Sequence, residues 1–204
     1  MLDNLNLQVF QIVVLVFSAV AHEYMHGWMA FRLGDSTAKD AGRLTVNPFA
    51  HLEWFGSFFM PFIMIISGMP FIIGWAKPVP YNPNNLQDRK YGELKVALAG
   101  PLANLAIAIA FGLVLRWLPF FNLTFVGLIG VIIYINLILM VFNLIPIPPL
   151  DGSKVLASFL PEPLRSRYLA ADRLGFIFVI LFVMLAGSLI IPLVNFLFGI
   201  IVGS

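Results

Sequence analysis

The feature that most constrains this chain is the pattern H-E-x-x-H formed by His22, Glu23 and His26 inside an apolar run. Histidines four residues apart lie on one face of a helix, so both imidazoles can bind a single zinc ion. A glutamate next to the first histidine can then act as the base that activates water. The flanking residues 10–21 and 28–33 are nearly all apolar, and ionisable groups inside a membrane segment are costly and usually functional. The pattern therefore indicates a hydrolytic metal site within a membrane.

The composition agrees with a membrane protein. The chain has 204 residues, of which 60% are hydrophobic and 11% are charged, which is far more apolar than a soluble domain. Its formal net charge of +2 is small and scattered, so we expect no nucleic-acid partner. The absence of cysteine excludes disulfides and cysteine-ligated zinc, so a metal must use His, Asp, Glu or Asn.

Apolar runs of about 20 residues can cross a bilayer as helices. They predict an all-α integral membrane protein with one domain over residues 1–204. Gly and Pro interrupt the second run, which we interpret as a re-entrant segment instead of a span. The predicted elements are a helix with H-E-x-x-H over 7–33, the re-entrant segment 54–75, and spanning helices over 96–118, 123–145 and 174–202.

Two histidines leave a catalytic zinc short of its usual three protein ligands. Asp151 is the candidate for the third ligand, since it follows the fourth apolar run and lies between Pro149 and Gly152. Irregular backbone at that depth needs burial in protein or a polar cavity. An ordinary turn aspartate is the alternative interpretation.

Three motifs together resemble the site-2 protease family of intramembrane zinc metalloproteases, peptidase family M50. They are the H-E-x-x-H pattern, A-G-P-L-A-N at residues 99–104 and N-x-x-P-x-x-x-L-D-G at residues 143–152. Residues 42–48 and 74–80 are similar to the small prokaryotic subgroup without a PDZ domain. The resemblance implies hydrolysis of peptide bonds within or near transmembrane segments of membrane protein substrates. It implies one zinc per chain, held by the two histidines and Asp151, with Glu23 as base.

The ligand set constrains the topology. If His22, His26 and Asp151 share one ion, an even number of membrane crossings must separate them, which requires the segment 54–75 to be re-entrant. Eleven of the twelve Lys and Arg residues then share one face, opposite Arg116. The positive-inside rule assigns that face to the cytoplasm. We therefore expect four spans in the cell membrane, both termini outside the cytoplasm, and an active site toward the cytoplasmic side.

Two further polar residues are candidates for the site. Asn143 could stabilise the oxyanion or hydrogen-bond a metal ligand, although helix packing or capping would also explain it. His51 precedes the predicted re-entrant segment and could bind the metal or substrate, although a surface or loop-packing histidine is the default interpretation. Asn104 and Gly100 are expected to join helices by hydrogen bonding and close approach.

Two other functions remain compatible with the motifs. In an intramembrane metal transporter or channel, the His and Asp side chains would line an ion path and Glu23 would have no catalytic part. A catalytically inert membrane binding protein is the second alternative, against which the intact set of His22, Glu23, His26 and Asp151 argues. No feature of the sequence predicts the cleavage sequence or the oligomeric state.

Overall fold

The computed structural model describes residues 4–54, 59, 62–63, 66–67, 77–117 and 122–203. These residues contain helices and connecting segments but no strand, which confirms the predicted all-α class. Three helices are long and apolar enough to cross a membrane, namely α1 (Asn4–Arg32), α4 (Gly92–Trp117) and α5 (Leu123–Asn143). The shorter elements are α2 (Thr37–Asp40), α6 (Asp151–Ala157), α7 (Leu164–Ala170), α8 (Gly175–Ala186), α9 (Ile190–Val202) and the 3-10 helices η1 (Pro48–Ala50), η3 (Pro83–Asn85), η4 (Ala171–Leu174) and η5 (Gly187–Leu189).

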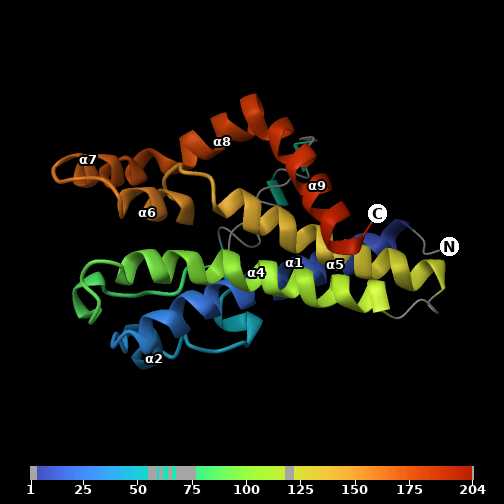
Figure 1. Cartoon of the computed structure of the whole chain (residues 1–204), viewed down its shortest axis with the longest axis horizontal. Coiled ribbons are helices and arrows are strands. Elements are labelled where there is room, and N and C mark those ends of the chain that lie inside the picture. The colour runs from blue at the N-terminus through green and yellow to red at the C-terminus, as the bar shows by residue number, and fades with distance from the viewer. Residues whose placement is uncertain are drawn as a thin grey trace.

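The long helices form an antiparallel bundle in which α4 packs against both α1 and α5 (Figure 1). Because successive long helices run in opposite directions, the end of α1, the start of α4 and the end of α5 meet at one end of the bundle. The short helices α2, α6 and α7 lie at that same end (Figure 1). Side chains far apart in the sequence are thereby gathered there.

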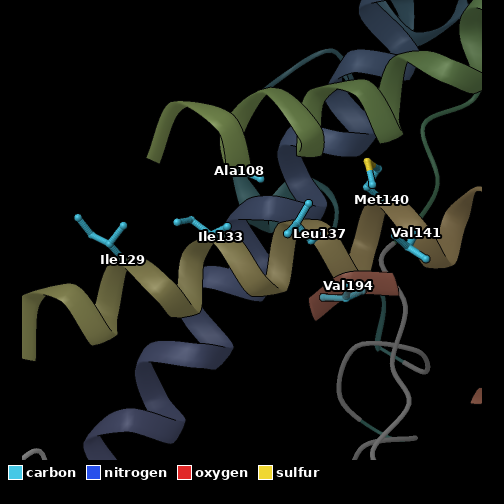
Figure 2. Close-up of a cluster of buried hydrophobic side chains, with 7 residues drawn as sticks. All are labelled: Ala108, Ile129, Ile133, Leu137, Met140, Val141 and Val194. Carbon is cyan, nitrogen blue, oxygen red and sulfur yellow. The ribbon is translucent and has the colours of Figure 1, made fainter. Parts of the chain in front are cut away.

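The apolar core is centred on α5, whose buried residues recur on one face of the helix. Figure 2 shows this row packed between Ala108 of α4 and Val194 of α9, both fully buried. The α5 members of the cluster are Ile129, Ile133, Leu137, Met140 and Val141. Many other apolar side chains of the long helices are exposed, for example Phe17 and Leu123, as expected where lipid replaces water as the solvent.

The predicted last span, 174–202, is not one straight helix. Its two parts, residues 177–185 and 187–202, meet at an angle of 63° and together are long and apolar enough for one broken span. Gly187 begins the 3-10 turn between α8 and α9. Pro192 has no N–H to donate to the carbonyl of Ser188, so a continuous helix would be broken there. As the third residue of α9, Pro192 occupies a position where that N–H is not needed.

Most of the predicted re-entrant segment 54–75 lies outside the described residues. The described chain resumes at Lys77, where residues 77–80 run without regular structure toward η3. This stretch reaches the end of the bundle where α1 ends and α4 begins, so it borders the region of the predicted metal site.

A buried carboxylate anchors that stretch to the end of α1. Asp35 is fully buried and accepts hydrogen bonds from the backbone N–H and hydroxyl of Thr37, from Asn82 N at 2.6 Å and from Asn85 Nδ2 at 3.0 Å. Burial alone would raise the pKa of Asp35, but these hydrogen bonds outweigh it and hold the pKa below its usual value. The ionised carboxylate therefore stabilises the folded state.

Replacing Asp35 by Asn is expected to lower the free energy of unfolding by about 2–3 kcal/mol at neutral pH, because an amide cannot accept from all of these donors. The folded-state pKa lies below the unfolded one, so the wild-type advantage is present above the unfolded pKa and disappears as pH falls through the folded pKa. Thermal unfolding in detergent between pH 7 and about pH 3 measures it. The control is Asp40→Asn, which alters an exposed carboxylate that accepts a hydrogen bond from the Ser36 hydroxyl. Equal stability losses in both variants would contradict the anchoring role.

Candidate metal centre

Three of the predicted site residues converge at the end of the bundle where α1 ends and α4 begins. His22 and His26 come from α1, and Asp151 is the first residue of α6, 129 positions after His22. The His22 Nε2, His26 Nε2 and Asp151 Oδ2 atoms form a triangle with edges of 3.0 Å. All three side chains are buried, with exposures of 6–8%. They are also the one group of metal-ligating side chains found among the described residues.

The donor set fits zinc. Two imidazole nitrogens with one carboxylate oxygen is a familiar ligand set for catalytic zinc, with bonds near 2.0–2.1 Å. Tetrahedral ligands at such distances lie about 3.3 Å apart, close to the 3.0 Å separations observed here. Zinc binds the ionised carboxylate and neutral imidazoles, so all three donor atoms must be free of protons.

A buried amide network determines how His22 presents its nitrogens. Asn136 Nδ2 donates to the carbonyl of Ile132, which leaves Asn136 Oδ1 to accept from Asn104 Nδ2 at 2.9 Å. Asn104 Nδ2 also donates to the carbonyl of Ser18, so Asn104 Oδ1 faces His22 Nδ1 at 2.6 Å. Because carbonyls only accept, these contacts place the proton on Nδ1 and leave the Nε2 lone pair free for a metal.

His26 is oriented by the backbone of α4. Its Nδ1 donates to the carbonyl of Val96 at 2.7 Å, so its Nε2 also keeps a free lone pair. The close approach of α4 depends on Gly100, because a side-chain methyl there would lie 2.7 Å from His22 Cε1 and even closer to His26. The A-G-P motif therefore allows α4 to pack directly against both imidazoles.

Glu23 is held beside the triangle by the extended stretch before η3. The backbone N–H of Val79 donates to Glu23 Oε2 at 2.9 Å. Gly27 makes room for this stretch, since a methyl at that position would lie 2.7 Å from Val79 Cγ1. One carboxylate oxygen of Glu23 is thus anchored, and the other has no hydrogen bond among the described residues.

A cavity of about 140 Å³ contains these groups. Glu23, Val79, Tyr81, Asn143 and Lys154 line it together with the triangle residues. Asn143 Nδ2 donates to Leu139 O of its own helix at 2.9 Å, so its place in the cavity wall is compatible with both roles considered from the sequence. The cavity thus brings a carboxylate, an amide and an ammonium group next to the ligand triangle.

His51 does not join this group. It is buried, its Nε2 lies 2.7 Å from the carbonyl of Thr45, and it neither lines the cavity nor belongs to the ligand triangle. The structure therefore brings together five of the six residues singled out from the sequence.

The interhelical contacts expected at Asn104 and Gly100 are confirmed, but the sequence did not predict that both residues contact the ligand histidines or that Val79 holds Glu23. The A-G-P-L-A-N motif pointed to helix contacts, and the structure places two of its members directly against the ligand histidines. Lys154 enters the sequence argument only as one of the eleven Lys and Arg residues on the expected cytoplasmic face. Its spacing of three residues from Asp151 could have indicated that it lies near the metal site, since residues at i and i+3 share a helix face.

Comparisons with known proteins agree with the geometry. YwhC of Bacillus subtilis, named "Putative zinc metalloprotease YwhC", is 34% identical over 94% of this chain and 88% of its own length. "Putative zinc metalloprotease MJ0611" of Methanocaldococcus jannaschii is 35% identical over 72% of each chain. "Putative zinc metalloprotease Rip2" of Mycolicibacterium smegmatis is 29% identical over 81% of this chain and 62% of its own length. No solved structure matches at a significant level.

The family assignment expected from the motifs is confirmed. Residues 10–187 match the sequence profile of peptidase family M50. Together with the apolar helices of the bundle, this match shows that the chain belongs to peptidase family M50 and is a multi-pass membrane peptidase.

Proposed function

We propose that this chain is an intramembrane zinc metalloprotease that cleaves peptide bonds within or near transmembrane segments of membrane proteins. The observation that carries the proposal is the ligand triangle, in which His22, His26 and Asp151 turn three donor atoms toward one point beside Glu23. The names of the relatives YwhC and MJ0611 support zinc as the metal. The position of the triangle within a bundle of membrane-length helices favours substrates that are themselves in the membrane.

Each residue of the site would have a distinct role in the reaction. Zinc bound by the triangle supplies Lewis acidity, which lowers the pKa of water and polarises the scissile carbonyl. Glu23 takes the proton from the attacking water and passes it to the leaving amine. The Val79 N–H keeps the Glu23 carboxylate in place for both transfers. Asn104 and the Val96 carbonyl keep the imidazoles in the tautomer that binds metal.

The distribution of charge supports a cytoplasmic location of the site. Arg32 and Lys154, with α2 and α7, belong to the end of the bundle that holds the triangle. Arg116 lies in the last turn of α4 at the opposite end, where it donates to the carbonyl of Ile200. The concentration of positive charge around the triangle is what the positive-inside rule expects of the cytoplasmic face of a cell membrane.

A metal transporter is the rival from another class. Transport requires ligands and a path for the ion, whereas hydrolysis requires a base beside an ion with an open coordination position. Glu23 borders the cavity without taking part in the triangle, which favours hydrolysis. Zinc flux through liposomes containing Glu23→Gln would instead support transport.

The direct test uses the full chain in liposomes with single-span test peptides of about 20 apolar residues, each interrupted centrally by Asn-Gly or Pro. Mass spectrometry locates any cut, and chelation followed by zinc addition shows whether cleavage depends on zinc. We expect cuts near the interruption that disappear on chelation and return with zinc. Cleavage that survives removal of the metal, or no cleavage of any interrupted peptide, would overturn the proposal.

A further inference from the structure

One positively charged side chain lines the cavity and has no part in the chemistry proposed above. Lys154 lies on α6, three residues after Asp151, and lines the cavity beside the ligand triangle. Apart from the two histidines, it is the one basic side chain among the described residues that line this cavity. A positive charge in so small a space bears on any reaction that develops negative charge there.

The tight fit of α6 at the end of α5 determines where Lys154 points. A methyl on Gly152 would overlap the backbone of Leu144 and Ile145, so the first turn of α6 lies directly against that backbone. Ser153 and Ala157 are buried on the inner face of α6. The ammonium group is therefore presented toward the cavity from a packed helix.

The ammonium group of Lys154 keeps its donors available. Its Nζ atom lies 3.8 Å from Asp151 Oδ1, beyond hydrogen-bonding distance, while Asp151 Oδ2 faces the two histidines. Its other close neighbour is the ring of Tyr81, 5.9 Å from Nζ to the ring centroid. No hydrogen bond to Nζ is found within the described part of the chain, and the side chain is 36% exposed. Within the described part of the chain, its three N–H donors are thus without an acceptor at the edge of the triangle.

Such a donor would assist the proposed reaction in addition to the metal. Attack of water on the scissile carbonyl moves charge onto the carbonyl oxygen, while the water proton passes to Glu23. The carboxylate of Asp151 cannot donate, and the Asn143 amide already uses one of its hydrogens on Leu139. A fixed donor beside the carbonyl oxygen is one of the largest contributions to catalysis of acyl transfer.

We propose that Lys154 is a catalytic residue that donates a hydrogen bond to the scissile carbonyl oxygen as that oxygen becomes negatively charged. No atom is transferred in this contact, since the ammonium proton stays on nitrogen. Lys154 acts in the transition state and contributes little to binding of the uncharged peptide, so its loss lowers kcat more than it raises KM. This inference rests on the proposed proteolytic function.

The test compares Lys154→Met and Lys154→Arg with wild type on the most rapidly cut test peptide, with zinc content measured on the same samples. Lys154→Met is expected to lower kcat by about 100-fold, the smaller end of the effect of removing one oxyanion donor. KM and zinc content stay near wild type, and Lys154→Arg restores most of the rate. The matched control is Lys95→Met, which also removes a lysine paired with an aspartate, Asp88, on an exposed surface.

A second measurement does not depend on turnover. A phosphinic analogue of the test peptide carries a tetrahedral, negatively charged group in place of the scissile bond. Its affinity for zinc-loaded Lys154→Met is expected to fall by about the same factor as kcat, because transition-state analogues share the interactions of the transition state. This measurement applies to folded protein even where the yield of the variant is low.

Several results would overturn the role of Lys154. Parallel loss of zinc and activity would mean that Lys154 acts by holding Asp151, and a raised KM at unchanged kcat would mean that it binds substrate. Unchanged phosphinic affinity, or an equal loss in Lys95→Met, would also contradict it. Absence of cleavage by wild type overturns the proposed function itself, whereas a wild-type rate in Lys154→Met overturns this inference alone.

Discussion

Replacement of Glu23 by Gln is expected to lower kcat/KM for the test peptides by about 100- to 10,000-fold, the range for loss of a general base. Gln has nearly the same shape, and its carbonyl oxygen can still accept from the Val79 N–H. Packing around the cavity should therefore persist while proton transfer is lost. Zinc content should remain near one per chain, because Glu23 is outside the ligand triangle.

The measurement combines cleavage rates with elemental analysis of the purified variant. Glu93→Gln is the matched control, since Glu93 pairs with Arg165 at the start of α4 and does not line the cavity. Its partly exposed ion pair contributes at most about 1 kcal/mol to stability. Cleavage at the wild-type rate by Glu23→Gln would remove this residue from the mechanism, and loss of zinc would make it a ligand.

Replacement of Asp151 by Ala is expected to remove both zinc and activity. Mutation of a residue that only orients a ligand costs about 10–100-fold in metal affinity, and loss of a ligand atom should cost more, on the order of 1000-fold at a three-ligand site. The truncation also leaves two buried imidazoles without their carboxylate partner. Zinc per chain, determined after dialysis against a weak chelator, measures the effect directly.

The control for Asp151→Ala is Asp88→Ala, which deletes an aspartate from an ion pair with Lys95 outside the cavity. This variant should keep zinc and activity. Zinc retained at full affinity in Asp151→Ala would mean that another side chain completes the site. His51 would be the first residue to examine, although the structure places it outside the triangle.

The local part of the metal site could be predicted because it depends on one helix. His22 and His26 are four residues apart within α1, and helix geometry alone brings their imidazoles 4.6 Å apart, centroid to centroid. Asp151 is the candidate third ligand because of its place after the fourth apolar run, and its sharing of one ion with the histidines then requires the ends of α1 and α5 to lie on the same side of the membrane. The structure places the two histidines and Asp151 together. Asp151 lies beyond the end of α5, and α5 itself contains no charged residue.

The last span shows what hydropathy cannot predict. A continuous apolar run over residues 174–202 predicts one helix, because hydropathy reports length and composition but not direction. Gly187 and Pro192 were present in that run, yet each is tolerated in membrane helices when neighbours satisfy the backbone. The bend of 63° between α8 and α9 is therefore a property of the packed chain.

The sequence by itself determined the fold class, the family and the candidate metal ligands, because residue spacing and apolar length act within single helices. The tertiary structure decided how those ligands are prepared for metal. The hydrogen bond from His22 to Asn104 joins residues 82 positions apart, the close approach at Gly100 joins two helices, and Val79 reaches Glu23 across 56 positions. Such contacts depend on the packing of one helix or loop against another, which no local pattern specifies.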